Sequence, residues 1–269
     1  AGSQGGSIVA SFNYAVRLME LPQGVFGISL ATFILPALAG MAAENKMKAF
    51  SRSLSQAFDY LFFLNLFVGA LLLVLAEPIV RLLFERGAFG VEATHRAALA
   101  LMCLAPGLVA FSAVNIFARA FFALGDTRTP MRVSVLCLAL NVVLVVILIG
   151  PYQQAGMGIA NSISSTLNAF LLYAALKRKR SDIKPDANSK NRVLTGLCVL
   201  LAAGAAWKIW EVCEAWIGHD NLTARLVVVF VPLAAAAAIY GVSALALRIP
   251  AARDIAGMVS KRLGGKEAE

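Results

Sequence analysis

The hydrophobic positions of this chain fall into seven long runs, separated by short segments that are polar or contain proline and glycine. A helix that crosses a membrane needs about 20 predominantly apolar residues, and each run reaches that length. The pattern therefore predicts an all-α fold, a polytopic membrane helix bundle with seven transmembrane helices. The runs cover residues 8–39, 54–76, 97–124, 130–149, 156–176, 193–212 and 222–247.

Two shorter segments mix apolar and charged positions as helices on a membrane surface do. The first covers 79–86, where Arg81 and Glu85 are four residues apart among apolar neighbours. The second covers 251–263, near the end of the chain. We expect both segments to lie along the interface rather than to span the membrane.

The first run carries only two charges, Arg17 and Glu20. An arginine deep in hydrocarbon costs roughly 3 kcal/mol or more, so it normally faces a protein interior or a water-filled cavity. Pro22 lies in the middle of the run and is expected to bend it. Two interpretations remain open: a polar substrate path, or two charges that neutralise each other in a packed bundle. At about 100° per residue, one helix face is polar or bare, and it carries Asn13, Arg17, Glu20 and Gly24.

The polar residues of the later runs are mostly amides and hydroxyls, which commonly join membrane helices through hydrogen bonds. Asn161, Ser165 and Asn168 share one face of the fifth run. They are candidates for lining a cavity, and the alternative is that they only hold helices together. Asp59 and Arg119 lie nearer the ends of their runs, where long side chains can extend to the interface.

The composition agrees with a membrane protein, because 59% of the residues are hydrophobic and the mean hydropathy is +0.76. The net charge is +9. When the loops are assigned alternately to the two sides, 17 Lys and Arg residues fall on one side and five on the other. The larger count marks the cytoplasm, so we expect the chain to start outside and its C-terminus to be cytoplasmic. The positive charge thus indicates topology and contact with membrane lipids, not binding to nucleic acid.

No arrangement of residues predicts an enzyme. The sequence has no evident pair of nucleophile and base and no metal-binding motif such as HExxH. Four scattered cysteines, without CxxC spacing, are interpreted as small core residues. We therefore predict no catalytic residue, no metal site and no cofactor. Because the chain does not begin with Met, we also expect it to be a fragment of a longer protein.

Two longer strings carry a family resemblance. Residues 13–27 read NYAVRLMELPQGVFG, and residues 115–130 read NIFARAFFALGDTRTP. They resemble signature stretches of the MurJ/MviN lipid II flippases of bacterial cell-wall synthesis, in the multidrug/oligosaccharidyl-lipid/polysaccharide exporter superfamily. The first string is similar to that family's eighth helix, and the second to the stretch that joins its tenth and eleventh helices.

The resemblance implies that the seven runs are the last seven helices of a fourteen-helix, two-lobe transporter. It divides the chain into the C-terminal lobe without its first helix at 1–180, a basic cytoplasmic loop at 181–192, two additional transmembrane helices at 193–247 and a cytoplasmic amphipathic tail at 248–269. The N-terminal lobe of the same protein would be a partner that this chain lacks.

The resemblance also implies a flippase in the bacterial cell inner membrane. It would carry lipid II, an undecaprenyl-diphosphate-linked peptidoglycan precursor, from the inner to the outer leaflet by alternating access. Arg17 matches a family arginine in the central cavity, which implies contact with the lipid diphosphate, and Asn13 and Glu20 lie beside it. The Asp that usually precedes this arginine is Val16 here, which leaves Glu20 as the expected partner of Arg17.

Some family members bind sodium through a carboxylate on the eleventh helix. That helix offers Asn141 and Val145 here, so no sodium site is predicted. The alternatives to lipid II transport are export of another polyprenyl-linked oligosaccharide or a drug, or the role of a non-transporting membrane scaffold subunit. In the leading hypothesis, this chain does not transport alone.

Overall fold

The computed structural model describes residues 2–87, 89–179, 189–218 and 221–264, and this part of the chain is helical without any strand. The predicted all-α fold is therefore confirmed. Residues 181–188 of the predicted basic loop and 265–269 of the predicted tail lie outside the described residues. The elements are α1 (Gly2–Pro22), a π-helical segment η1 (Gln23–Ile28), α2 (Ser29–Ala43), α3 (Met47–Val74), α4 (Ala76–Phe84), α5 (Val91–Leu104), a short 3₁₀ turn η2 (Ala105–Gly107), α6 (Leu108–Ala123), α7 (Arg128–Lys179), α8 (Ser189–Ile217), α9 (Leu222–Ala246) and α10 (Pro250–Gly264).

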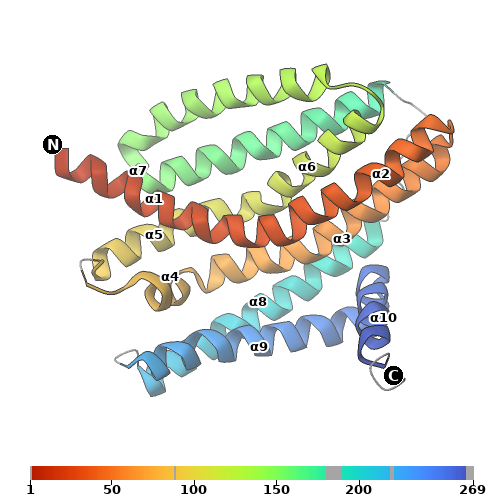
Figure 1. Cartoon of the computed structure of the whole chain (residues 1–269). Helices are drawn as coiled ribbons and strands as arrows, with labels where there is room; N and C mark the ends of the chain where they lie inside the picture. Colours follow the sequence, from red (N-terminus) through yellow and green to blue (C-terminus); the bar gives the residue numbers. More distant parts are fainter. Residues whose placement is uncertain (1, 88, 180–188, 219–220, 265–269) are drawn as a thin grey trace.

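Five helical stretches in the described part are long and apolar enough to cross a membrane. One of them, α7, folds back on itself at Gln153, whose φ of 49° and ψ of −127° are not helical, so it supplies two antiparallel arms (Figure 1). The first predicted run is not among the five, and the predicted count of seven stays a prediction. The stretches are Met47–Val74, Val91–Ala123, Arg128–Lys179, Lys190–Ile217 and Leu222–Ala246.

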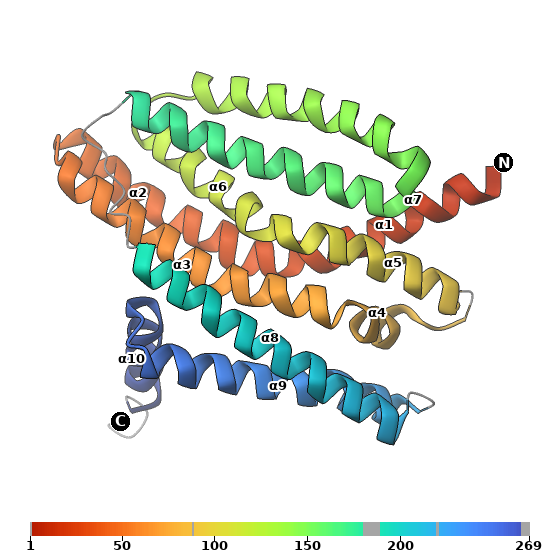
Figure 2. The same ribbon diagram turned by 180° about the vertical axis from the view of Figure 1, so that it is seen from behind.

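The first predicted run forms one long, curved rod of α1, η1 and α2 (Figures 1 and 2). Pro22 ends α1, and the π-helical segment follows directly. Proline has no backbone N–H to donate, so the regular α-helical hydrogen bonding is interrupted there. The disturbance expected at Pro22 thus takes the form of a wider helical turn in the middle of the rod.

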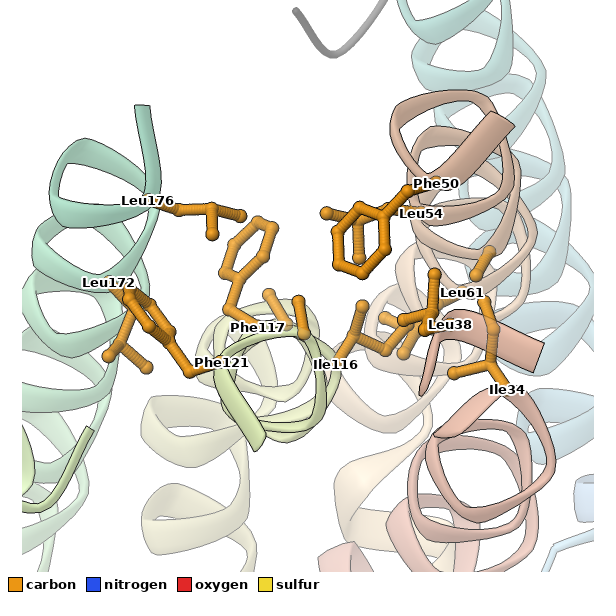
Figure 3. Packing of buried hydrophobic residues seen from close by; sticks show 13 residues of the cluster. Ile34, Leu38, Phe50, Leu54, Leu61, Ile116, Phe117, Phe121, Leu172 and Leu176 are labelled. Atoms are coloured by element: carbon orange, nitrogen blue, oxygen red, sulfur yellow. The ribbon is translucent and has the colours of Figure 1, made fainter. Parts of the chain in front are cut away.

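A hydrophobic core joins α2, α3, α6 and the second arm of α7. Phe117 and Phe121 of α6 lie between Phe50 of α3 and Leu172 of α7, and all are buried (Figure 3). The stacked rings of Phe58 and Phe117 add a contact with 5.7 Å between their centroids. This core holds the α2 half of the curved rod in place.

A second core attaches the pair α8 and α9 to α3. The ring of Tyr240 in α9 stacks on Phe67 and Phe63 of α3, and its hydroxyl donates a hydrogen bond to the carbonyl oxygen of Phe63 at 2.8 Å. Small side chains at the contact, such as Ala202 and Ala236, let the helices approach closely. α10 lies across the end of α9 (Figures 1 and 2).

Helix α4 corresponds to the short helix predicted at 79–86, but it begins at Ala76 and ends at Phe84. We expected a helix that lies along the membrane surface. Its Arg81 is buried, with 8% of the residue exposed, and its charge is paired with Glu77 of the same helix and with Glu214 of α8. The placement of the helix along the membrane surface stays a prediction.

Candidate functional site

Helix α1 presents two different faces. Ala15, Leu18 and Met19 are buried and belong to a core shared with α5. Asn13 and Arg17 lie on the exposed side of the same helix. The predicted division into an apolar and a polar face is therefore realised, with the polar face directed away from the packed core.

The polar face of α1 lines an open pocket of about 470 Å³. Asn13, Arg17 and Glu20 all contribute to it, so the structure brings the three predicted substrate-binding residues together. Among the described residues, no ion pair joins Arg17 to Glu20. Their mutual neutralisation in a dry, packed contact therefore does not fit the geometry of this chain. Both side chains remain available to a ligand.

Aromatic packing fixes the rotation of α1 about its own axis. The ring of Tyr14 contacts those of Phe84 and Phe89, with centroid distances of 4.8 and 5.0 Å. Tyr14 also lines the pocket, so its packing fixes the side of α1 on which Arg17, three residues later, lies.

Gly24 does not line the pocket that contains Arg17. It lies in η1, and a Cβ atom added there would meet nothing within 4 Å. Its predicted cavity-lining role remains a prediction.

The three polar residues of the fifth run lie on the second arm of α7, away from the pocket that contains Arg17. The Nδ2 atom of Asn141 donates to Oδ1 of Asn161 at 3.2 Å, and Nδ2 of Asn168 donates to Oγ of Ser134 at 3.5 Å. Ser165 is buried and donates to the carbonyl oxygen of Asn161 at 2.7 Å. In this structure two of these residues connect the arms of α7, and none of the three lines the Arg17 pocket.

Comparison with known proteins agrees with the helical membrane fold. The sequence model of the family described as "Lipid II flippase MurJ" matches residues 4–227. The chain belongs to the lipid II flippase MurJ family. The resemblance stated from residues 13–27 and 115–130 is therefore confirmed.

In each match with an individual family member, the matched region is a larger share of this chain than of the relative. A "Probable lipid II flippase MurJ" of Rhizobium meliloti (strain 1021) is 39% identical over 168 residues, which are 62% of this chain and 31% of that protein. One of Haemophilus influenzae is 30% identical over 247 residues, covering 88% and 47%. The solved structure "Lipid II flippase MurJ, inward closed conformation" shares the fold, with a TM-score of 0.68 at 20% identity, covering 89% of this chain and 48% of that one. This chain thus spans half or less of these relatives.

Sequence reasoning missed a cluster of charges at the α4 end of the bundle. Arg81 donates to Glu77 at 2.7 Å and to Glu214 of α8 at 2.6 Å. Glu85 lies 3.8 Å from Arg81 and accepts a hydrogen bond from Arg225 of α9 at 3.0 Å. The spacing of Arg81 and Glu85 was visible in the sequence, but the partners on α8 and α9 are distant along the chain. The cluster fastens α8 and α9 to α4.

Asp126 is a second residue whose role was missed. It precedes α7, and its Oδ1 accepts hydrogen bonds from the backbone N–H groups of Arg128 and Thr129. Its Oδ2 accepts from Lys179 at 2.6 Å and from the Thr129 hydroxyl at 2.6 Å. The hydrogen bonds from Lys179 and Thr129 hold the pKa of Asp126 well below its ordinary value. Asp126 therefore caps α7 and joins the two ends of this helix hairpin, which lie away from the bend at Gln153.

Among the described residues, no group of three or more His, Cys, Asp or Glu side chains is arranged to hold a metal ion. The polar pocket on α1 is instead suited to a ligand that carries its own charge. An arginine can bind two oxygens of a phosphate at once, and the neighbouring amide and carboxylate can orient hydroxyl or amide groups.

Proposed function

We propose that this chain is the C-terminal part of a flippase that moves lipid II from the inner to the outer leaflet of the bacterial inner membrane by alternating access. The relatives it matches bear the name of that activity, and they are about twice as long or more. An N-terminal lobe of the same protein would therefore complete the transport path. The activity is transport and not catalysis.

One observation supports the proposal most directly: Arg17 is exposed to an open pocket within a long apolar run whose only other charge is Glu20. Such a charge is too costly to face hydrocarbon, so it requires a wet cavity or an anionic ligand. We assign to Arg17 the contact with the lipid diphosphate. Asn13 and Glu20 are proposed to contact polar groups next to it.

The remaining candidates are proposed for the complete transporter. Gly24 lies in η1, directly after α1, with open space around it. The three polar residues on the second arm of α7 would line the cavity that the two lobes enclose. These residues are Asn161, Ser165 and Asn168.

The proposed division of the chain follows the arrangement of its helices. In this proposal residues 1–180 form the lobe, 181–192 connect it to the next span, 193–247 form two additional membrane helices and 248–269 a tail. Residues 189–192 of the connection already belong to α8. Packing of α8 and α9 against each other and against α3 supports this division. The excess of basic residues on one side supports a start outside and a cytoplasmic C-terminus.

Complementation tests this function. The chain is joined to the N-terminal lobe of a family member, the host flippase is depleted, and growth is compared at matched membrane expression. We expect the wild type to rescue growth, Arg17→Ala to fail and Arg17→Lys to rescue only partly, because lysine cannot bind two oxygens in one plane.

The matched control is Arg132→Ala, which removes an exposed arginine that does not line the Arg17 pocket. This variant should rescue like the wild type. Rescue by Arg17→Ala would contradict the assigned role of Arg17. Failure of a folded wild-type protein would point to a different exported lipid or to a scaffold role.

A further inference from the structure

A second pocket lies where α3, α8 and α10 meet. Its volume is about 260 Å³. Arg52 and Tyr60 of α3, Arg192 of α8 and Asp254 of α10 all line it. Sites for drug-sized molecules usually have roughly 300–1,000 Å³, so this pocket suits a smaller group.

The depth of the pocket can be worked out along α3. An uninterrupted stretch of uncharged, mostly apolar residues runs from Leu61 to the start of α4 at Ala76. A hydrocarbon layer about 30 Å thick corresponds to about 20 helical residues, which places its other boundary near residue 56. Arg52 is therefore at the level of the lipid head groups, and Tyr60 lies just inside the boundary.

The positive side of the pocket consists of two arginines in different states. Arg192 is already paired within the protein. Its Nε donates to Asp59 at 2.9 Å, and its guanidinium lies 4.9 Å from the centre of the Phe58 ring. Arg52 is exposed, and no ion pair joins it to a described residue. Arg52 is thus available to an anionic group at head-group depth.

The negative side of the pocket is Asp254. Its Oδ2 accepts a hydrogen bond from the Tyr60 hydroxyl at 2.6 Å, and Gln56 in turn donates to that hydroxyl at 2.8 Å. Asp254 is exposed, and a carboxylate has about four acceptor sites, so it can bind a further donor. The chain Gln56–Tyr60–Asp254 fixes the direction of this charge.

We propose that this pocket binds the phosphoethanolamine head group of a membrane phospholipid, with the phosphate on Arg52 and the primary ammonium on Asp254. Both signs of charge are present, and the four ionised side chains that line the pocket, those of Arg52, Asp59, Arg192 and Asp254, cancel each other. A purely anionic head group would place its charge beside Asp254 without compensation. A choline group has no N–H to donate to that carboxylate.

The surroundings fit a lipid rather than a free solute. Phe62 and Phe63 line the same pocket on the hydrocarbon side, where the glycerol and first acyl carbons would lie. The site is separate from the Arg17 pocket and does not depend on the transport role. A bound lipid would connect α10 to α3 and α8.

Native mass spectrometry of the intact protein tests the proposal. The protein is released from micelles that hold equal amounts of phosphatidylethanolamine, phosphatidylcholine and phosphatidylglycerol, and retained lipids are counted. We expect preferential retention of phosphatidylethanolamine. Asp254→Asn should lower its preference over phosphatidylcholine about tenfold, the loss expected for one charge-assisted hydrogen bond. Arg52→Gln should reduce retention of all three lipids.

The matched control is Arg253→Gln, which alters an exposed charge next to Asp254 outside the pocket and should leave retention unchanged. A thermal melt verifies the folding of each variant. Preference of the wild type for phosphatidylglycerol, or an unchanged preference in Asp254→Asn, would overturn the proposal. If an equal concentration of soluble glycerophosphoethanolamine displaced the lipid, the proposal that the site binds a membrane lipid, and not a free solute, would be wrong.

Discussion

Arg81 is expected to be the residue whose loss most weakens the attachment of α8 and α9 to the lobe. Its side chain is only 10% exposed and lies among the carboxylates of Glu77, Glu85 and Glu214. Arg81→Met keeps much of the volume and removes the charge. The three carboxylates would then repel each other, with Arg225 alone left to compensate Glu85.

The expected cost follows from the burial of the partners. Removal of one member of a buried ion pair costs about 3–5 kcal/mol. Glu77 and Glu214 are 30% and 26% exposed, so water screens them in part, and the lower end of that range applies. A protein of this size loses about 2–4 °C of melting temperature per kcal/mol, which gives a decrease of about 6–12 °C.

Intrinsic fluorescence provides a local assay, because all three tryptophans, Trp207, Trp210 and Trp216, lie on α8. Melting of detergent-solubilised protein is followed by tryptophan emission and by circular dichroism. In Arg81→Met, the fluorescence transition should occur below the circular dichroism transition, since α8 detaches first. The double variant Arg81→Met/Glu214→Gln should lower the melting temperature by less than the sum of the decreases in the two single variants.

Arg86→Met serves as the control, because Arg86 is exposed and follows the same helix. It should change the melting temperature by less than about 2 °C. A similarly small change in Arg81→Met would refute the reasoning, since it would mean that the cluster is solvated and contributes little. Coincident transitions in Arg81→Met would refute its local action on α8.

Two further predictions concern the hairpin formed by α7. Asp126→Ala should destabilise the protein by about 2 kcal/mol, because a helix cap and a half-exposed ion pair are lost together. The lowered pKa of Asp126 means that its stabilisation is present above the unfolded pKa of about 4 and is lost at lower pH, so the melting temperatures of wild type and variant should converge on acidification. A pH-independent difference would contradict this. Gly156→Ala should cost about 1–3 kcal/mol, because its Cβ would overlap the carbonyl oxygen of Leu148, whereas Gly150→Ala, with open space around it, should be tolerated; equal melting temperatures for the two would contradict the packing argument.

Much of the fold was predictable because the length of an apolar run is a direct physical requirement of the membrane. The two arms of α7 match the runs 130–149 and 156–176, although the structure joins them through Gln153. The first run was harder to predict. Its interruption by η1 depends on local hydrogen bonding after Pro22, which the pattern of apolar residues does not contain.

The candidate site was predictable only where all of its residues lie on one helix. Asn13, Arg17 and Glu20 share a face by periodicity alone, and the structure places them on one pocket. The expected pairing of Arg17 with Glu20 was not observed, because contacts between long exposed side chains depend on rotamers and not on spacing. Contacts between distant segments, such as Arg81 with Glu214, have no signature in a single sequence.

The π-helical segment η1 has a consequence for the direction of Arg17. A π turn accommodates more residues than an α turn, so it shifts the angular phase between the helix before it and the helix after it. α2 is held by its own core, while α1 carries the pocket residues. The wider turn at Gln23–Ile28 takes up the difference between the two packings, so that α1 keeps its contacts with α5 while α2 stays in its own core. The orientation of Arg17 thus depends on the length of one helical turn as well as on the packing of Tyr14 against Phe84 and Phe89.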